Sequence, residues 1–278
     1  MDILLYAKQN KDSFEVGNVS SNQIHTFDFE GKRYVLKTPL MVGDNLSPFW
    51  RMMKNVFRFD FEKQSAHLEE VYDTLKTNPH IPVAPLVAAD GEVMLYEYIE
   101  GSSWDEDEFP GGTDNAYRLG QYVGYNHRIA HINSGIIGAE DVTDFYASML
   151  SHMGECIQTH WNSEDAIDKK VREYFASIKE MRFVSSKYSL MMVDMSADQF
   201  LYDGEKIVAC VDLDAYVIGP VEWELSLLKT QITDWERFRA GYEMYQPMPE
   251  FEEASKLFFF LMALNVHWDK QEMEGVLQ

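Results

Sequence analysis

The first hundred residues alternate apolar and polar positions in a way that predicts short strands. Residues 13–39 contain β-prone runs separated by the turn-like segments 17–22 and 30–32. Residues 86–101 are typical of a hairpin with its turn at Asp90–Gly91. Between them, residues 57–77 place apolar side chains at helical spacing, which predicts one helix in an otherwise β-rich segment.

From about residue 113 the apolar pattern becomes helical. It predicts helices over 115–132 and 166–181, and helical structure from Pro220 to the end, with a strand–turn–strand at 190–216. The expected fold class is α+β with two lobes, a β-rich N-terminal lobe over 1–98 and a mainly helical C-terminal lobe over 99–278. A hinge joins them near residues 97–103.

The amino-acid composition indicates an ordinary globular protein. Apolar residues make up 46% of 278 residues, as in ordinary globular proteins, and no basic-then-apolar leader is seen at the N-terminus. The apolar run 257–264 is too short to cross a membrane and predicts a buried helix. The cysteines, Cys156 and Cys210, do not form a disulfide framework, so a reducing cytoplasm is expected.

The net charge of −22 argues against nucleic acid as a partner, because phosphates attract Lys and Arg. The same charge would steer a cationic substrate towards the protein. Solubility, or adaptation of the host to salt, explains the charge equally well. The oligomeric state stays open.

Two apolar runs that end near aspartates carry the candidate chemistry. Asp194 and Asp212 follow runs that read as buried strands, and a buried carboxylate is costly unless it is paired or holds a cation. Asp194 can accept a proton from a substrate hydroxyl. The amide of Gln199 and the carboxylate of Asp212 can hold one cation, and such a set of oxygen ligands suits Mg²⁺.

The order Asp194, Gln199, Asp212 resembles the aminoglycoside phosphotransferase and choline kinase group, which has the protein-kinase-like fold. The family's His-Gly-Asp-x-x-x-x-Asn motif corresponds to MVDMSADQ, residues 192–199. Its Ile-Asp-Phe-Asp/Glu motif, with the later Gly-Pro and Trp-Asp-Leu, corresponds to VDLDAYVIGPVEWEL, residues 211–225. The resemblance implies an ATP-dependent phosphotransferase with Asp194 as the catalytic residue and Asp212 and Gln199 as Mg²⁺ ligands. Glu224 would brace the catalytic loop.

The resemblance covers roughly residues 13–230 and also assigns a nucleotide site. Lys37 resembles the strand lysine that holds the α and β phosphates, with Glu62 as the preferred acidic partner and Glu69 as the second choice. The remaining candidate ATP contacts are two serines of a phosphate-covering loop and three hinge residues: Ser20, Ser21, Glu97, Tyr98 and Ile99.

Three positions depart from the family pattern and keep other functions open. Met192 replaces a histidine, Gln199 an asparagine and Glu224 an aspartate. A pseudokinase and a non-catalytic binding protein are therefore the alternatives to catalysis. Protein phosphorylation is a weaker one, because no long activation loop fits between Asp212 and residues 219–225.

The expected acceptor is a small hydroxylated, cationic molecule such as an aminoglycoside, an amino alcohol or an amino sugar. The acidic run 104–109, Asp144 and the tail segment 272–275 are candidates for recognising its amines. His127 and His131 have a spacing that can hold zinc, although helix packing explains them better.

Overall fold

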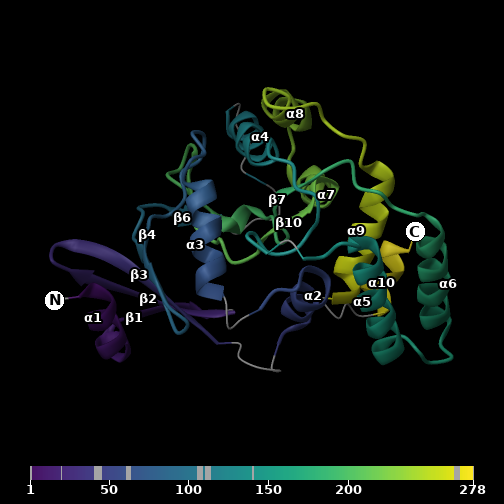
Figure 1. Cartoon of the computed structure of the whole chain (residues 1–278), viewed down its shortest axis with the longest axis horizontal. Coiled ribbons are helices and arrows are strands. Elements are labelled where there is room, and N and C mark those ends of the chain that lie inside the picture. The colour runs from purple at the N-terminus through teal and green to yellow at the C-terminus, as the bar shows by residue number, and fades with distance from the viewer. Residues whose placement is uncertain are drawn as a thin grey trace.

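The computed structural model describes residues 2–19, 21–40, 46–60, 64–104, 109, 114–139, 141–265 and 270–277. It confirms the predicted α+β class with two lobes. In Figure 1 the sheet and α1 lie at one end of the molecule, and α5, α6, α9 and α10 lie at the other. Between these ends lie β7, β10 and α7.

The N-terminal lobe is an antiparallel sheet with the order β1-β2-β3-β5-β4. Its strands are β1 (Glu15–Val19), β2 (Asn22–Phe29), β3 (Lys32–Pro39), β4 (Leu86–Ala89) and β5 (Met94–Glu97). Successive side chains of a strand point to opposite faces. Leu95 of β5 therefore packs with Ala7 of α1 (Ile3–Asn10), while Met94 and Tyr96 pack in the core cluster that contains Leu68 of α3 (Gln64–Leu75).

The sequence did not predict α1 or α2 (Pro48–Phe57). The helix expected over 57–77 is confirmed as α3, but its predicted start was too early, because Phe57 belongs to α2. Arg58 ends α2 in a left-handed conformation, with φ of 61°, and α3 begins only at Gln64. The two helices belong to different cores. Met52, Met53, Val56 and Phe57 of α2 are buried with the C-terminal helices. Helix α3 packs with β5.

The C-terminal lobe is mainly helical. Its helices are α4 (Asn115–Asn126), α5 (Phe145–His160), α6 (Ala166–Glu180), α7 (Val221–Gln231), α8 (Trp235–Tyr242), α9 (Glu252–Asn265) and α10 (Lys270–Val276). The predicted strand–turn–strand at 190–216 was too simple. The strand β7 (Tyr188–Met192) pairs with β10 (Tyr216–Pro220), and β8 (Phe200–Tyr202) pairs with β9 (Ile207–Cys210) and with β6 (Ser102–Ser103). Gly204, with φ of 99°, makes the β8–β9 turn.

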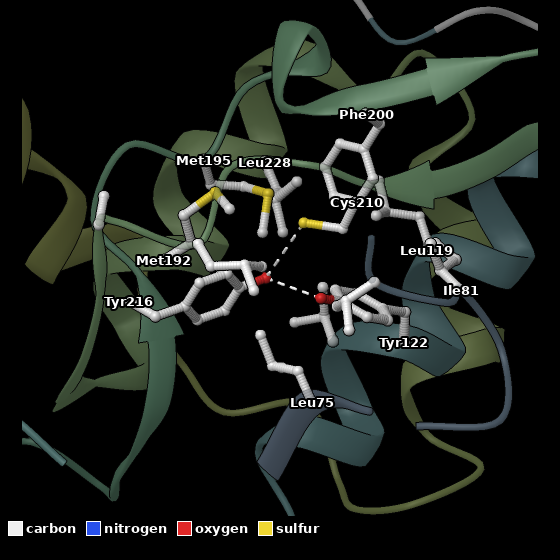
Figure 2. Packing of buried hydrophobic residues seen from close by; sticks show 14 of the residues in the cluster. Leu75, Ile81, Leu119, Tyr122, Met192, Met195, Phe200, Cys210, Tyr216 and Leu228 are labelled. Atoms are coloured by element: carbon white, nitrogen blue, oxygen red, sulfur yellow. Dashed lines mark hydrogen bonds between the residues drawn. The ribbon is translucent and has the colours of Figure 1, made fainter. Parts of the chain in front are cut away.

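The lobes share a buried seam. The amide of Ala84 donates to the Cys210 carbonyl at 3.1 Å, and the Cys210 amide donates to the Pro82 carbonyl at 2.9 Å. Figure 2 shows the apolar core around this seam, where the hydroxyls of Tyr122 and Tyr216 lie 2.8 Å apart. Burial raises the pKa of the Cys210 thiol to about 12, so this cysteine stays protonated and inert.

Among the described helices, none combines the length and the apolar character that a membrane span requires. The run 257–264 lies within α9, where Leu257, Phe258, Phe260 and Leu261 are buried. The prediction of a buried helix there is confirmed.

Glycines set the close packing of α4 on α8. A Cβ on Gly120 would lie 2.0 Å from the Phe238 carbonyl oxygen, and one on Gly241 would lie 2.1 Å from the Tyr117 carbonyl oxygen. Gly275 of α10 has open space around the equivalent position.

We expect Gly120→Ala to destabilise the protein by about 1–3 kcal/mol or more, because α4 and α8 must move apart. The matched change Gly275→Ala should be neutral or stabilise by up to about 1 kcal/mol, because alanine favours the helix. Urea unfolding of both variants checks this. Equal midpoints would show that the glycine contact does not set the helix spacing.

Candidate phosphotransfer site

One small hollow gathers the polar residues of the predicted site. Its lining combines Ser21 from the start of β2, the aromatic first turn of α2 and two loops of the C-terminal lobe. The lining residues are Ser21, Phe49, Trp50, Met192, Asp194, Gln199, Asp212, Asp214 and Ala215. The structure thus brings together Asp194, Gln199 and Asp212, which the sequence placed in one site.

Asp194 lies two residues beyond the end of β7 and remains accessible to solvent. Desolvation by the surrounding chain, together with the negative charges of Asp212 and Asp198, raises the pKa of Asp194 to about 6. A carboxyl with such a pKa is ionised at neutral pH and is a better base than an ordinary aspartate.

Lys37 of β3 pairs with one of the carboxylates that line the hollow. Its ammonium lies 3.1 Å from Oδ1 of Asp212, and its side chain is almost fully buried. Burial alone lowers the pKa of Lys37, but the carboxylates of Asp212 and Asp214 outweigh it and raise the pKa above its usual value. The lysine is therefore a permanent positive charge at the junction of the lobes.

Asp214 is a site residue that the sequence analysis did not assign. It is buried, and Asn22 of β2 donates to its Oδ2 at 2.8 Å. Burial and the neighbouring Asp212 raise the pKa of Asp214 to about 6, against the opposing effect of Lys37. Its Oδ1 is buried without a hydrogen-bond partner among the described residues. The spacing Asp-x-Asp in 212–214 was the available signal.

The oxygen atoms at this place suit a magnesium ion. Carboxylates of Asp212 and Asp214 and the amide of Gln199 converge on the hollow, and oxygen ligands are what Mg²⁺ prefers. Gln199 is buried in the short helix η3 (Ala197–Gln199), and its carbonyl accepts from the Val211 amide at 3.0 Å. The unpartnered Oδ1 of Asp214 adds a free ligand atom.

Glu224 of α7 supports the segment that carries Asp194. Its Oε1 accepts from the Met192 amide at 2.8 Å, and its Oε2 lies 2.8 Å from Nε2 of His127. Nδ1 of His127 lies 3.1 Å from the Tyr242 hydroxyl. A carboxylate buried at this depth is stable only with such partners. His127 is thus a packing residue that links α4, α7 and α8.

Helix α3 presents a histidine towards the catalytic lobe. Nε2 of His67 lies 2.8 Å from the Tyr216 carbonyl, and burial lowers the pKa of His67 to about 4, so the ring is neutral. Glu69 is exposed on α3, and Glu62 lies outside the described residues. In the described part, the acidic partner within reach of Lys37 is Asp212.

Of the predicted hinge residues, Glu97 ends β5, and Tyr98 and Ile99 follow it. The amide of Glu97 donates to the Pro85 carbonyl at 2.9 Å, and that of Tyr98 donates to the Arg33 carbonyl at 3.0 Å. Ile99 packs against the core that both lobes share. In the loop predicted to cover phosphate, Ser21 lines the hollow, and Ser20 lies outside the described residues.

The candidate amine-binding residues are dispersed. Asp144 caps α5 by accepting from the Ala147 amide at 2.9 Å, and Glu274 pairs with Lys170 at 2.6 Å. Residues 105–108 of the acidic run lie outside the described residues. His131 donates its backbone amide to the Tyr188 carbonyl at 2.9 Å. The described residues contain no group of three or more His, Cys, Asp or Glu side chains placed to hold a metal.

Comparison with known proteins identifies solved structures that share this fold. No protein-family model matches the sequence, and no curated protein matches it. Solved structures do match over nearly the whole chain. Macrolide 2'-phosphotransferase MphH from Brachybacterium faecium is 14% identical, with a TM-score of 0.60 and coverage of 99% of this chain and 96% of that one.

Two aminoglycoside phosphotransferases agree with it. APH(4)-Ia is 11% identical, with a TM-score of 0.65 and coverage of 99% of this chain and 98% of its own. The streptomycin–ATP complex of APH(2")-IIa is 15% identical, with a TM-score of 0.57 and coverage of 100% and 95%. At such identities the likeness establishes the fold, and this chain has the protein-kinase-like fold of small-molecule phosphotransferases.

Proposed function

We propose that this protein is an ATP-dependent phosphotransferase that moves the γ-phosphate to a hydroxyl of a small molecule. The observation that carries the proposal is the convergence of Asp194, Gln199 and Asp212 on one hollow, with Lys37 paired to Asp212. One structural neighbour binds streptomycin and ATP, which supports a nucleotide and a small acceptor for this fold.

ATP would lie between an N-terminal lobe of residues 1–98 and a C-terminal lobe of residues 99–278. Lys37 would hold the α and β phosphates, with Ser21 near them, and Glu62 would orient the lysine. The amides of Glu97 and Tyr98 donate to the Pro85 and Arg33 carbonyls, so we assign the carbonyl of Glu97 and the amide of Ile99 as the backbone groups that would meet adenine.

Asp212 and Gln199 would hold Mg²⁺, and Asp214 adds a third oxygen ligand. When bound, the ion neutralises charge on the phosphates that the protein would otherwise have to balance. The protein's own contribution is to keep these oxygen atoms in place. Asn22 fixes Asp214, and the Val211 amide fixes the backbone of Gln199.

Asp194 would orient the acceptor hydroxyl and take its proton. The acceptor oxygen forms the new bond to the γ-phosphorus, the bond to the bridging oxygen breaks, and ADP leaves. The Met192 amide is bonded to Glu224, so the loop would have a brace that does not depend on the histidine of the resembled family. This favours catalysis over the pseudokinase alternative.

The proposed acceptor carries a positive charge, because a net charge of −22 attracts cations and repels anionic sugars. The free cysteines Cys156 and Cys210 favour a reducing cytoplasm as the place of action. Neither nucleic acid nor a membrane is a proposed partner.

Thermal unfolding with ATP tests the nucleotide site. With Mg²⁺ and ATP at about 100 times the dissociation constant, the free energy of unfolding should rise by about 2.7 kcal/mol. Asp212→Asn should abolish the Mg²⁺-dependent part of this shift, while Asp141→Asn, which changes an exposed carboxylate, should keep it. The absence of a shift with either ATP or GTP in the wild type would instead support the plain binding protein.

Asp194→Asn separates catalysis from binding. It should lower phosphate transfer about 100- to 10,000-fold, because the base is lost, and it should retain the Mg²⁺·ATP melting shift. ADP release with aminoglycosides and amino alcohols measures the transfer. Unchanged turnover in the variant would remove Asp194 as the base, and absence of transfer in the wild type would favour the pseudokinase.

The raised pKa of Asp194 also predicts a pH-dependent effect on stability. Because the folded state binds the proton more tightly, the charge of Asp194 destabilises the fold fully above pH 6 and not below about pH 4. Asp194→Asn should therefore melt higher than wild type at pH 8, by less than about 1 kcal/mol because the group is accessible to water. Melting curves at pH 8 and 4 measure the difference, which should vanish at pH 4.

A further inference from the structure

A buried asparagine joins the two lobes at the phosphotransfer site. Asn22 is the first residue of β2, and its side chain donates to Oδ2 of Asp214 at 2.8 Å, although 192 positions separate the two residues. Both residues are only 3% exposed. An ionised carboxylate can only accept hydrogen bonds, so the amide nitrogen of Asn22, and not its oxygen, must face Asp214. Asn22 therefore ties the N-terminal sheet to the segment that carries the proposed Mg²⁺ ligands.

The same amide nitrogen also faces a candidate phosphate-binding group. It lies 3.4 Å from the hydroxyl oxygen of Ser21, which lines the hollow. An amide has two N–H donors, so one can serve Asp214 while the other serves Ser21. When the Ser21 oxygen accepts from Asn22, its own hydrogen is left to donate to an anionic phosphate oxygen. The Ser21 backbone is fixed as well, because its carbonyl accepts from the Leu40 amide at 3.0 Å.

The contact between Asn22 and Asp214 is a poor arrangement for stability alone. Oδ1 of Asn22 and Oδ1 of Asp214 are both buried without a hydrogen-bond partner among the described residues. A buried acceptor without a partner costs free energy, and two apolar side chains of similar shape would avoid that cost. Such atoms in a native fold call for an explanation. A cation bound at Asp212, two residues away, supplies one, because a free carboxylate oxygen is a ligand that Mg²⁺ takes.

Lys37 makes a second contact between the sheet and this segment, at 3.1 Å from Asp212. Under the proposed function both of these groups change partners when ligands bind, because the lysine turns to the phosphates and Asp212 turns to Mg²⁺. The bond from Asn22 to Oδ2 of Asp214 competes with neither ligand, since Oδ1 of Asp214 remains available. It can therefore persist when Mg²⁺ and the nucleotide are both bound.

We propose that Asn22 is a positioning residue that couples the binding of Mg²⁺ to the binding of the nucleotide phosphates. The inference rests on the proposed function and deepens it. Asn22 is not among the residues that line the hollow, so it acts through Asp214 on the metal side and through Ser21 on the phosphate side. Coupling of this kind is reciprocal, so bound nucleotide strengthens the binding of Mg²⁺ by the same factor.

The test measures a coupling factor by calorimetry on the full-length protein. This factor is the ATP dissociation constant without Mg²⁺ divided by the constant with saturating Mg²⁺. The complex of Mg²⁺ with free ATP contributes equally for every variant, so differences report on the protein. We expect Asn22→Leu to lower the coupling factor about 10- to 100-fold, as for the loss of one hydrogen bond to a charged group.

Asn115 provides the matched control. It is also 3% exposed, and it bonds the Glu205 carbonyl at 3.0 Å and the Ile207 amide at 3.1 Å without lining the hollow. Asn115→Leu therefore removes an equally buried amide and should keep the wild-type coupling factor. An equal loss of coupling in Asn115→Leu would show that the stability of the fold sets the factor, which would overturn the role of Asn22.

Ser21→Ala cuts the same bridge at its phosphate end, on a half-buried turn residue whose loss leaves the core intact. It should lower the coupling factor as Asn22→Leu does, and the double variant should lose no more than either single variant, within about twofold. A wild-type factor in either single variant, or losses that multiply in the double variant, would overturn the proposal. A wild type without any ATP melting shift would overturn the proposed function itself, whereas a normal shift with unchanged coupling in the variants would overturn only the role of Asn22.

Discussion

Three carboxylates, those of Asp194, Asp212 and Asp214, line one hollow, and like charges so close repel one another. The surrounding structure supplies partners that offset this repulsion. The ammonium of Lys37 lies against Asp212, and the amide of Asn22 donates to Asp214. Both partners come from the N-terminal sheet, whereas the carboxylates come from the C-terminal lobe. The repulsion is therefore balanced only when the two lobes are together.

The loop that carries Asp194 is braced from within the C-terminal lobe. Asp194 receives no compensating cation among the described ion pairs, and desolvation together with the charges of Asp212 and Asp198 raises its pKa. Its loop is held instead through the backbone, by the bond from Met192 to Glu224, and Glu224 is in turn held by His127 of α4. The glycine contacts between α4 and α8 fix that helix in place. The position of the Asp194 carboxylate thus depends on helix packing that lies several residues away from it.

Much of the fold and of the candidate site could be predicted from the sequence. Where a prediction failed, the cause was physical. The relation between Asp212 and Glu224 could be predicted, because only one loop, one strand and the start of α7 separate these residues along the chain. The pairing of β7 with β10 could not be predicted, because the alternation of apolar and polar residues within a strand does not indicate which strand it pairs with. Similarly, the helix expected from residue 57 starts too early, because Phe57 is the last residue of α2 and Arg58 ends that helix in a left-handed conformation that the apolar pattern does not reveal. The contact of His67 with the Tyr216 carbonyl joins distant segments, so no local pattern in the sequence predicts it.

The bond beneath the catalytic loop has a consequence for how such chains diverge. Glu224 grips the peptide N–H of residue 192, which every amino acid except proline provides. The side chain of Met192 is buried in the apolar core and also lines the hollow, so the backbone bond leaves its chemical type to these surroundings. A residue other than histidine can therefore stand at this position while the backbone bond persists. Signature patterns that demand that histidine will pass over proteins whose loop is held in the same way.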